Sequence, residues 1–128
     1  VNVCPRPASG RTPIDGLRPH SREPVFVRRG LSAFSDSYFH QALARSAGRT
    51  CLLAGFSAPF SILATLFDAQ TRDVELTLVP EAVGSRAVDP RNVADTRAMA
   101  FDLASRLAPA MRCETIARRW GREPAAAG

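Results

Sequence analysis

Lysine is absent from this sequence, and all 17 basic residues are arginines. The chain therefore cannot form a Schiff base, supply a Walker A lysine or use any catalytic lysine. Histidine is nearly as scarce, with His20 and His40 alone. No apolar run approaches the roughly 20 residues that a membrane span needs, and residues 1–13 lack the pattern of a signal peptide. We therefore expect no membrane association.

Cysteine is also sparse. Cys4, Cys51 and Cys113 are odd in number and widely spaced, without a C-x-x-C or Cys/His pattern. Neither a zinc site nor a disulfide framework is predicted, and no glycine-rich phosphate loop is present, so we expect no metal and no cofactor. Cys51 lies in an apolar run and is expected to be a buried small side chain. A reducing cytoplasm is the simplest location for such a chain.

The residues that are present fit one folded domain, because 45% of the 128 residues are hydrophobic. The net charge is +5. The densest basic group lies near the C-terminus and comprises Arg112, Arg118, Arg119 and Arg122. Such a group suits a nucleic acid or an acidic ligand, but Trp120 alone offers a stacking surface there. A solvated basic helix end is the favoured interpretation, and no nucleic-acid partner is expected.

The chain divides into three parts. Residues 1–24 hold five of the ten prolines and are expected to be an irregular lead, with at most a short strand at Val1–Cys4. Residues 25–120 are expected to form an α/β domain, and residues 121–128 a flexible tail.

Strands are predicted at Pro24–Arg28, Thr50–Phe56, Val74–Val79 and Ala110–Thr115. The run Thr50–Phe56 is continuously apolar, as expected for a strand covered on both faces. Helices are predicted from the cap Ser35 or Asp36 through Phe39, Ala42, Leu43 and Ala47 to Gly48, from Pro59 through Ile62, Leu63, Leu66 and Phe67, and from the cap Asp95 through Met99, Leu103 and Leu107. A short basic helix ends the domain. This alternation predicts a Rossmann-like parallel sheet flanked by helices.

Ligands of open parallel sheets bind at the carboxyl ends of the strands. The most informative such end follows Phe56, where the chain turns through Ser57, Ala58 and Pro59 and a helix opens around Phe60 or Ser61. A helix N-terminus favours negative charge, and free N–H groups in such a turn can hold an oxyanion.

Three blocks of this sequence resemble the isochorismatase-like cysteine hydrolases: VFVRRGLSAF at 25–34, LLAGFSAPFSILATLFDA at 52–69 and VELTLVPEAVGSRA at 74–87. The resemblance spans roughly residues 10–118 and implies the family's Rossmann-like fold. It also implies hydrolysis of a small-molecule vinyl ether such as isochorismate, or of an amide such as nicotinamide. The Ser-Ala-Phe block is more similar to the isochorismatase branch.

The resemblance also exposes departures from the family pattern. Arg28 occupies the position of the family's catalytic Lys, and Ser61 that of its nucleophilic Cys. Glu81 stands where the family usually has Asp. The family's proton-accepting Asp ends a first strand for which this chain shows no counterpart. The resemblance further implies a cis peptide bond between Phe56 and Ser57.

The resemblance assigns the remaining site roles as well. The N–H groups of Ser57 and Ser61 would form the oxyanion hole, and Phe34 and Phe56 would contact the substrate. The plainer alternatives are a capping Ser61, an Arg28 paired with an acid or water, and a trans turn.

A serine is a much weaker acid than a cysteine and needs an adjacent base, which an arginine cannot be. We therefore expect weak or no hydrolysis. The alternative is a non-catalytic pseudo-enzyme that binds a ligand or mediates oligomerisation. A less favoured reading takes GFSAP at 55–59 as the nucleophile elbow of a serine α/β-hydrolase. In that motif Pro59 replaces a glycine, and no histidine follows His40.

The missing first strand has a structural consequence, because the resemblance places it between the strands that end at Arg28 and Phe56. These two strands must then pair directly or receive a strand from elsewhere. We expect the chain to be a fragment of a larger fold, or to be completed by a partner chain or a second copy.

Overall fold

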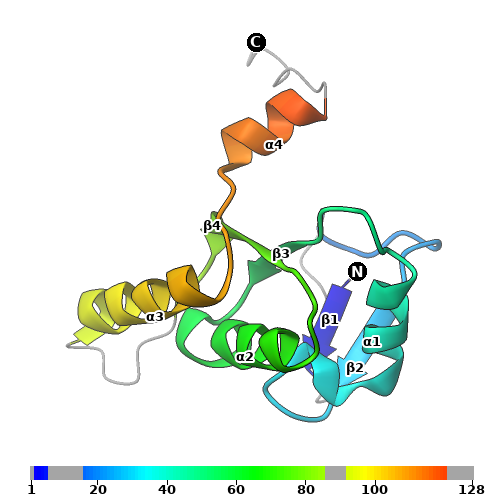
Figure 1. The fold of residues 1–128 in the computed structure, drawn as a ribbon, viewed down its shortest axis with the longest axis horizontal. Helices are drawn as coiled ribbons and strands as arrows, with labels where there is room; N and C mark the ends of the chain where they lie inside the picture. The colour runs from blue at the N-terminus through cyan, green and yellow to red at the C-terminus, as the bar shows by residue number, and fades with distance from the viewer. Residues whose placement is uncertain (1, 6–15, 86–91, 121–128) are drawn as a thin grey trace.

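The computed structural model describes residues 2–5, 16–85 and 92–120. Its strands form two parallel pairs. β1 (Asn2–Pro5) pairs with β2 (Val25–Arg28), and β3 (Leu52–Gly55) pairs with β4 (Thr77–Val83). Helices flank these pairs (Figure 1). The α/β class with parallel strands is therefore confirmed, and the short strand expected in the lead is present as β1.

The helical elements follow the predicted order along the chain. They are η1 (Ala33–Ser35), α1 (Ser37–Ala44), the π-helical turn η2 (Ala58–Ile62), α2 (Leu63–Thr71), α3 (Val93–Leu107) and α4 (Cys113–Arg119). Asp36 caps α1 as expected, because its Oδ1 accepts the Tyr38 N–H at 2.9 Å. Gly48, with φ of +81°, lies beyond the end of this helix.

The strand pairs do not join into one sheet among the described residues, and β2 does not pair with β3. Figure 1 shows β1 on the side of β2 that faces β3. The expectation that the third strand is covered on both faces is wrong: Leu52 and Leu53 are half-buried, and Ala54 is exposed. The apolar side chains of Leu52 and Leu53 instead line a cavity.

The core gathers around α2, where Leu66 is only 1% exposed and Ile62 is also buried. The expected apolar stripe of this helix is only partly right, because Phe67 is 51% exposed. The predicted face of α3 is wrong. Its buried residues are Ala100 and Ala104, which pack into the core, whereas Met99 is 67% exposed and Leu103 is also exposed.

The start of α3 also differs from the prediction. Asn92 occupies the cap position, and Asp95 lies in the first turn of the helix instead of capping it. A carboxylate there still complements the helix dipole.

Two strand predictions need correction. β4 begins at Thr77 instead of Val74, because the Val74 N–H bonds to the Ala69 carbonyl and helps to close α2. The segment 110–115 is not a strand: it makes a single bridge, between Leu78 and Ala110, and α4 begins at Cys113. Figure 1 shows α4 extending away from the strands. In the described part of the chain no helix has the length and apolarity to cross a membrane.

Candidate active site

The turn after β3 is held by main-chain hydrogen bonds. The Gly84 N–H donates to the Gly55 carbonyl at 3.0 Å, and the Ala58 N–H donates to the Gly84 carbonyl at 2.9 Å. Gly55 has φ of +122°, which favours glycine, and the Phe56–Ser57 peptide bond is cis, as the resemblance implied. These bonds fasten the turn to the carboxyl end of β4.

Ser61 lies in the π-helical turn that follows. The Ile62 N–H reaches back to the Ser57 carbonyl at 3.2 Å, which makes this turn wider than an α-helical one. Ser61 is half-buried and lines a cavity of about 510 Å³ together with Arg28 and Phe56. Within the described residues no other side chain hydrogen-bonds to Ser61 Oγ. The structure thus brings three of the predicted site residues to one cavity.

Arg28, at the end of β2, folds back onto the loop that follows it. One guanidinium nitrogen donates to the carbonyls of Gly30 at 2.9 Å and Leu31 at 2.6 Å. Both acceptors are main-chain carbonyls of the loop that follows β2. Arg28 therefore braces this loop while it also lines the cavity. Its Nε and second terminal nitrogen keep further donors.

The loop after Arg28 is fixed to α2 through Thr65, a residue that the sequence analysis missed. Thr65 is buried, and its Oγ1 accepts the Ala33 N–H at 3.0 Å. Ser32 caps η1 by accepting the Phe34 N–H at 3.1 Å. Ser35 Oγ accepts the Gly30 N–H at 3.0 Å. The only sequence signal for Thr65 is a polar residue at helical spacing from the apolar Ile62 and Ala69, which are both buried.

The two residues predicted to contact the substrate, Phe34 and Phe56, lie in different surroundings. Phe56 lines the cavity and is 76% exposed, and its ring lies against Gly84, where an added Cβ would meet Phe56 Cε1 at 2.0 Å. Phe34, in contrast, is 7% exposed, packs edge-on against Phe39 and is not among the residues that line this cavity. The placement of Phe34 against the substrate is therefore not supported, because its ring is a core group.

Ser57 anchors the turn through its carbonyl, which accepts the N–H groups of Phe60 at 3.1 Å and Ile62 at 3.2 Å. Its Oγ is buried and has no hydrogen-bond partner among the described residues. The oxyanion role of the Ser57 and Ser61 N–H groups stays a prediction.

The described lining of this cavity contains none of the usual general bases. Its lining residues in the described chain include no histidine and no carboxylate, and the titratable groups are Arg28 and Cys51. His20 is exposed in the loop before β2, and His40 on α1 lines a different cavity. Nor do the described segments contain a group of three or more His, Cys, Asp or Glu residues that could hold a metal.

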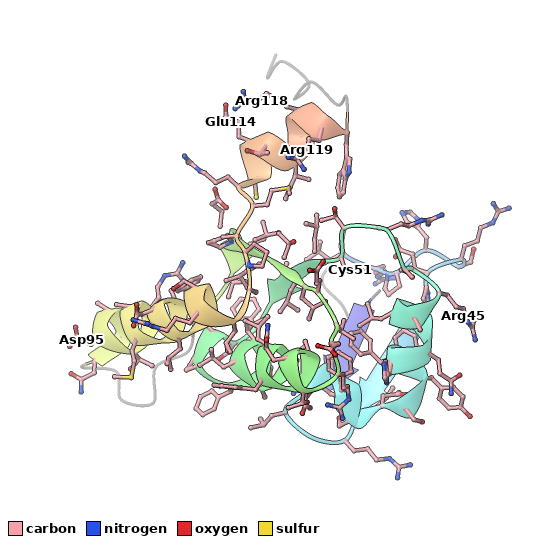
Figure 2. All side chains as sticks on the ribbon, viewed as in Figure 1. Arg45, Cys51, Asp95, Glu114, Arg118 and Arg119 are labelled. Carbon is pink, nitrogen blue, oxygen red and sulfur yellow. The ribbon has the colours of Figure 1, made fainter. Side chains whose placement is uncertain are left out.

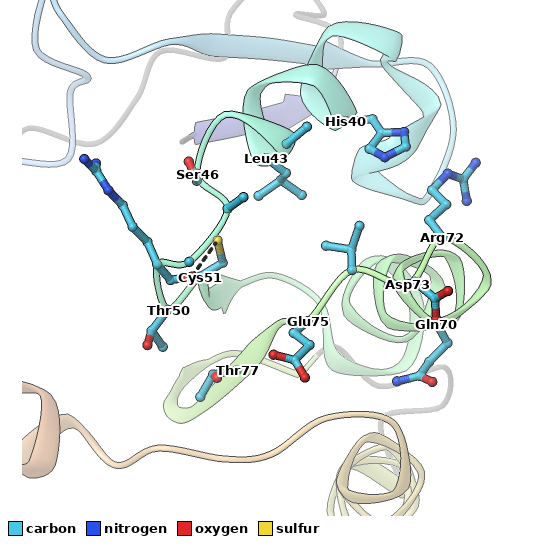
Figure 3. Close-up of a pocket in the computed structure, with 15 residues that line it drawn as sticks. His40, Leu43, Ser46, Thr50, Cys51, Gln70, Arg72, Asp73, Glu75 and Thr77 are labelled. Carbon is cyan, nitrogen blue, oxygen red and sulfur yellow. Dashed lines mark hydrogen bonds between the residues drawn. The ribbon is translucent and has the colours of Figure 1, made fainter.

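The cavity that His40 lines is larger, at about 960 Å³, and charged residues such as Arg72, Asp73 and Glu75 surround it (Figure 3). It lies at the amino end of β3, beside Cys51, whereas ligands of parallel sheets bind at the carboxyl ends. We therefore place the candidate active site in the smaller cavity.

Cys51 is half-buried, not fully buried as expected, and its Sγ lies 3.8 Å from the Arg49 carbonyl (Figures 2 and 3). At about 3.3 Å per residue along a strand, Cys51 is too far from the turn at Ser57 to replace Ser61 as the nucleophile.

Glu81 forms an ion pair with Arg112, whose Nε lies 3.1 Å from Glu81 Oε1. The pKa of Glu81 is lowered from its ordinary value, first by its own backbone N–H and then by the hydrogen bond from Arg112. Arg118 pairs with Glu114 at 2.8 Å on α4 (Figure 2). Two arginines of the basic group near the C-terminus, Arg112 and Arg118, are thus paired with neighbouring acids. Arg122 lies outside the described residues.

Comparison with known proteins agrees with this geometry. Residues 1–114 match the family model of the isochorismatase domain. The chain belongs to the isochorismatase family. No curated protein sequence matches it.

Solved structures of the isochorismatase family share the fold. An isochorismatase-like hydrolase from Alkaliphilus metalliredigens superposes with a TM-score of 0.71 at 17% identity, covering 84% of this chain and 56% of that one. An isochorismatase family protein from Desulfovibrio vulgaris subsp. vulgaris str. Hildenborough gives 0.66 at 23% identity, with 85% and 55% covered. A pyrazinamidase/nicotinamidase from Streptococcus mutans UA159 gives 0.57 at 24% identity, with 68% and 46% covered. This chain therefore spans about half the length of these structures.

Proposed function

We propose that this chain is a hydrolase-family domain that binds a small molecule in the Ser61 cavity and hydrolyses it weakly or not at all. The observation that carries the proposal is the composition of that cavity. A hydroxyl and a guanidinium line it at the carboxyl ends of β2 and β3, with no histidine or carboxylate among its described lining residues.

The chemistry follows from these groups. To attack a carbonyl or vinyl ether carbon, Ser61 Oγ must lose its proton to a base as the new bond forms. Arg28 stays protonated and cannot accept that proton. It can hold a carboxylate of the ligand through its remaining donors. The cavity is therefore better equipped to bind an anionic small molecule than to turn it over.

Turnover is tested with isochorismate and nicotinamide as substrates, comparing the parent with Ser61→Ala, Ser61→Cys and the matched control Ser46→Ala. Ser46 lines the same cavity but follows α1, and its Oγ donates to the Ala42 carbonyl at 3.3 Å. We expect the parent and Ser61→Ala to be equally slow. Parent activity that Ser61→Ala abolishes and Ser46→Ala preserves would establish a serine enzyme and refute the proposal.

Binding is tested separately by calorimetry with the same two compounds. Arg28→Gln should weaken binding of isochorismate, which carries carboxylates, by about 10- to 150-fold, because a charge-assisted hydrogen bond contributes roughly 1.5–3 kcal/mol. Binding of neutral nicotinamide should change little. Equal affinity of the parent and the variant for isochorismate would contradict the role of Arg28.

The second candidate is a pseudo-enzyme whose role is ligand binding or assembly alone. The half-exposed apolar residues of β3 favour it, because they offer a surface to another chain. If the parent and Ser61→Cys are both inactive, the pseudo-enzyme hypothesis is supported. Activity of Ser61→Cys alone favours a hydrolase scaffold that lacks its nucleophile.

A serine α/β-hydrolase is the least supported reading, because His40 lines another cavity. A cytoplasmic location is also proposed, since Cys51 and Cys113 are free thiols.

A further inference from the structure

A further cavity lies between α4 and the beginning of β3. Its volume is about 400 Å³, and it is lined by Leu52 from β3 and by Ile116 and Trp120 at α4. Although Leu52 also lines the candidate active site, neither Arg28 nor Ser61 lines this cavity. It is therefore a different site from the one proposed for hydrolysis.

The short segment before α4 fixes the helix beside this cavity. The Met111 N–H donates to the Leu78 carbonyl at 2.8 Å, and the Arg112 side chain pairs with Glu81 at 3.1 Å. Both contacts fasten the segment to β4. The helix itself has no buried residue, so a ligand can reach the groups that α4 presents to the cavity.

The walls of the cavity are apolar and include one aromatic ring. Leu52, Met111 and Ile116 line it and are half-buried, and Trp120 lines it and is 67% exposed. An exposed indole offers a face on which another flat ring can stack. The thioether of a methionine also packs favourably against aromatic rings. These side chains therefore suit a ligand with a flat aromatic body.

Two arginines add positive charge to this cavity. Arg49, before β3, and Arg119, on α4, both line it, and its described lining contains no carboxylate. Neither guanidinium has a hydrogen-bond or ion-pair partner among the described residues, whereas Arg118 pairs with Glu114. Figure 2 shows Arg119 on the side of α4 that faces the rest of the molecule, and Glu114 and Arg118 on the other side. The unpaired positive charges therefore belong to the cavity.

We propose that this cavity binds a flat aromatic carboxylate, whose ring stacks on Trp120 and whose carboxylate is held by Arg49 and Arg119. A planar guanidinium binds a carboxylate through paired N–H donors and also stacks on aromatic rings. A volume of about 400 Å³ lies within the range of small-molecule pockets.

The lining favours a carboxylate over a nucleotide, which would also combine a ring with an anion. Thr50 is the one uncharged hydroxyl or amide side chain among the described lining residues. The hydroxyl groups of a sugar would therefore find few hydrogen-bond partners. A carboxylate attached directly to the ring needs only the two guanidinium groups.

The test is an NMR titration of the isotope-labelled 128-residue chain with 2-naphthoate. Trp120 is the only tryptophan in the sequence, so its indole N–H gives a single signal that reports on this cavity. The matched control ligand is 2-naphthamide, which keeps the ring but carries no charge. We expect naphthoate to shift the indole signal and to bind about tenfold more tightly than naphthamide, because it pairs with two exposed charges.

Substitutions test the two arginines and the ring, with affinities measured by calorimetry. Arg119→Gln is compared with Arg118→Gln, and Arg49→Gln with Arg45→Gln. Both control arginines are exposed and neither lines the cavity. Only Arg49→Gln and Arg119→Gln should weaken naphthoate, each by about three- to fivefold, and neither should affect naphthamide. Trp120→Leu should weaken both ligands by about two- to tenfold. All these side chains are exposed, so the variants should fold as the parent does.

Equal affinities for naphthoate and naphthamide, or equal effects of a cavity arginine and its control, overturn the proposal. Shifts at the Arg28 and Ser61 amides with the Trp120 indole signal unmoved would assign naphthoate to the Ser61 cavity and overturn it as well. So would tighter binding of AMP than of naphthoate, which would indicate a nucleotide site. An indole signal that changes on dilution without ligand would assign the cavity to a second copy and also overturn the proposal. None of these outcomes depends on hydrolytic activity.

Discussion

Replacing Thr65 by valine should loosen the loop that follows Arg28, to which the Arg28 guanidinium is hydrogen-bonded. The substitution keeps the shape of the side chain but removes the acceptor of the buried Ala33 N–H, which lies 3.0 Å from Thr65 Oγ1. Leaving such a donor unsatisfied costs about 1–3 kcal/mol. With a urea m value of about 2 kcal/mol/M, the unfolding midpoint should fall by roughly 0.5–1.5 M.

The control for this prediction comes from the same helix. Thr71 Oγ1 donates to the Asp68 carbonyl at 2.9 Å, and Thr71 is exposed. Thr71→Val should therefore change the free energy of unfolding by no more than about 0.5 kcal/mol. Hydrogen exchange at the Ala33 amide should accelerate in Thr65→Val but not in Thr65→Ser, which retains the acceptor. Equal stability of the two valine variants, with unchanged exchange at Ala33, would refute the reasoning.

Two further predictions concern the rim of the site. Gly84→Ala should push the Phe56 ring out of the cavity, because the new Cβ would lie 2.0 Å from Phe56 Cε1. Since the ring is exposed, the free energy of unfolding should fall by only about 0.5–1.5 kcal/mol. A loss above about 3 kcal/mol in urea unfolding would show that the ring cannot move. Arg112→Gln should raise the pKa of Glu81 part of the way to its ordinary value, because the backbone N–H also lowers it. The contribution of this carboxylate to stability is present above its unfolded pKa and is lost as the pH falls through the lower folded pKa. A carboxyl NMR titration with the same midpoint in both proteins would argue against the ion pair.

Local sequence signals predicted the elements that depend on short-range chemistry. Asp36 followed by apolar residues at helical spacing indicated α1, and its side chain does cap that helix. The apolar run ending in Gly55 indicated β3, and the turn beyond it led to the cavity that contains Ser61. A glycine or a capping carboxylate decides the backbone within a few residues, so these features can be read from the sequence.

The errors arose where tertiary contacts decide. The spacing of Met99 and Leu103 predicted the buried face of α3, but the helix approaches the core through Ala100 and Ala104. Small side chains permit close packing of helices, and a pattern that scores large apolar residues underrates them. Phe34 follows the same logic, because nothing in the sequence distinguishes a ring that packs on Phe39 from one that meets a ligand.

The predicted topology placed a ligand site at the carboxyl ends of the strands, but the pairing of Arg28 with Ser61 in it came from the resemblance. Residues 28 and 61 are far apart in the sequence, and their common cavity depends on how β2 and β3 are placed. Thr65 and Gly84 carry no local motif. Their roles appear only when the loop after β2 and the turn after β3 are seen against α2 and β4.

The interlock among Gly55, Gly84 and Ala58 is built wholly from peptide groups. The side chain of Ser61 takes no part in these bonds, so exchanging its oxygen for sulfur would leave them in place. The nucleophilic atom at position 61 can therefore be replaced during evolution without a change in the main-chain turn that supports it. A turn of this kind can persist after activity is lost, and a single substitution at position 61 can restore a thiol to it.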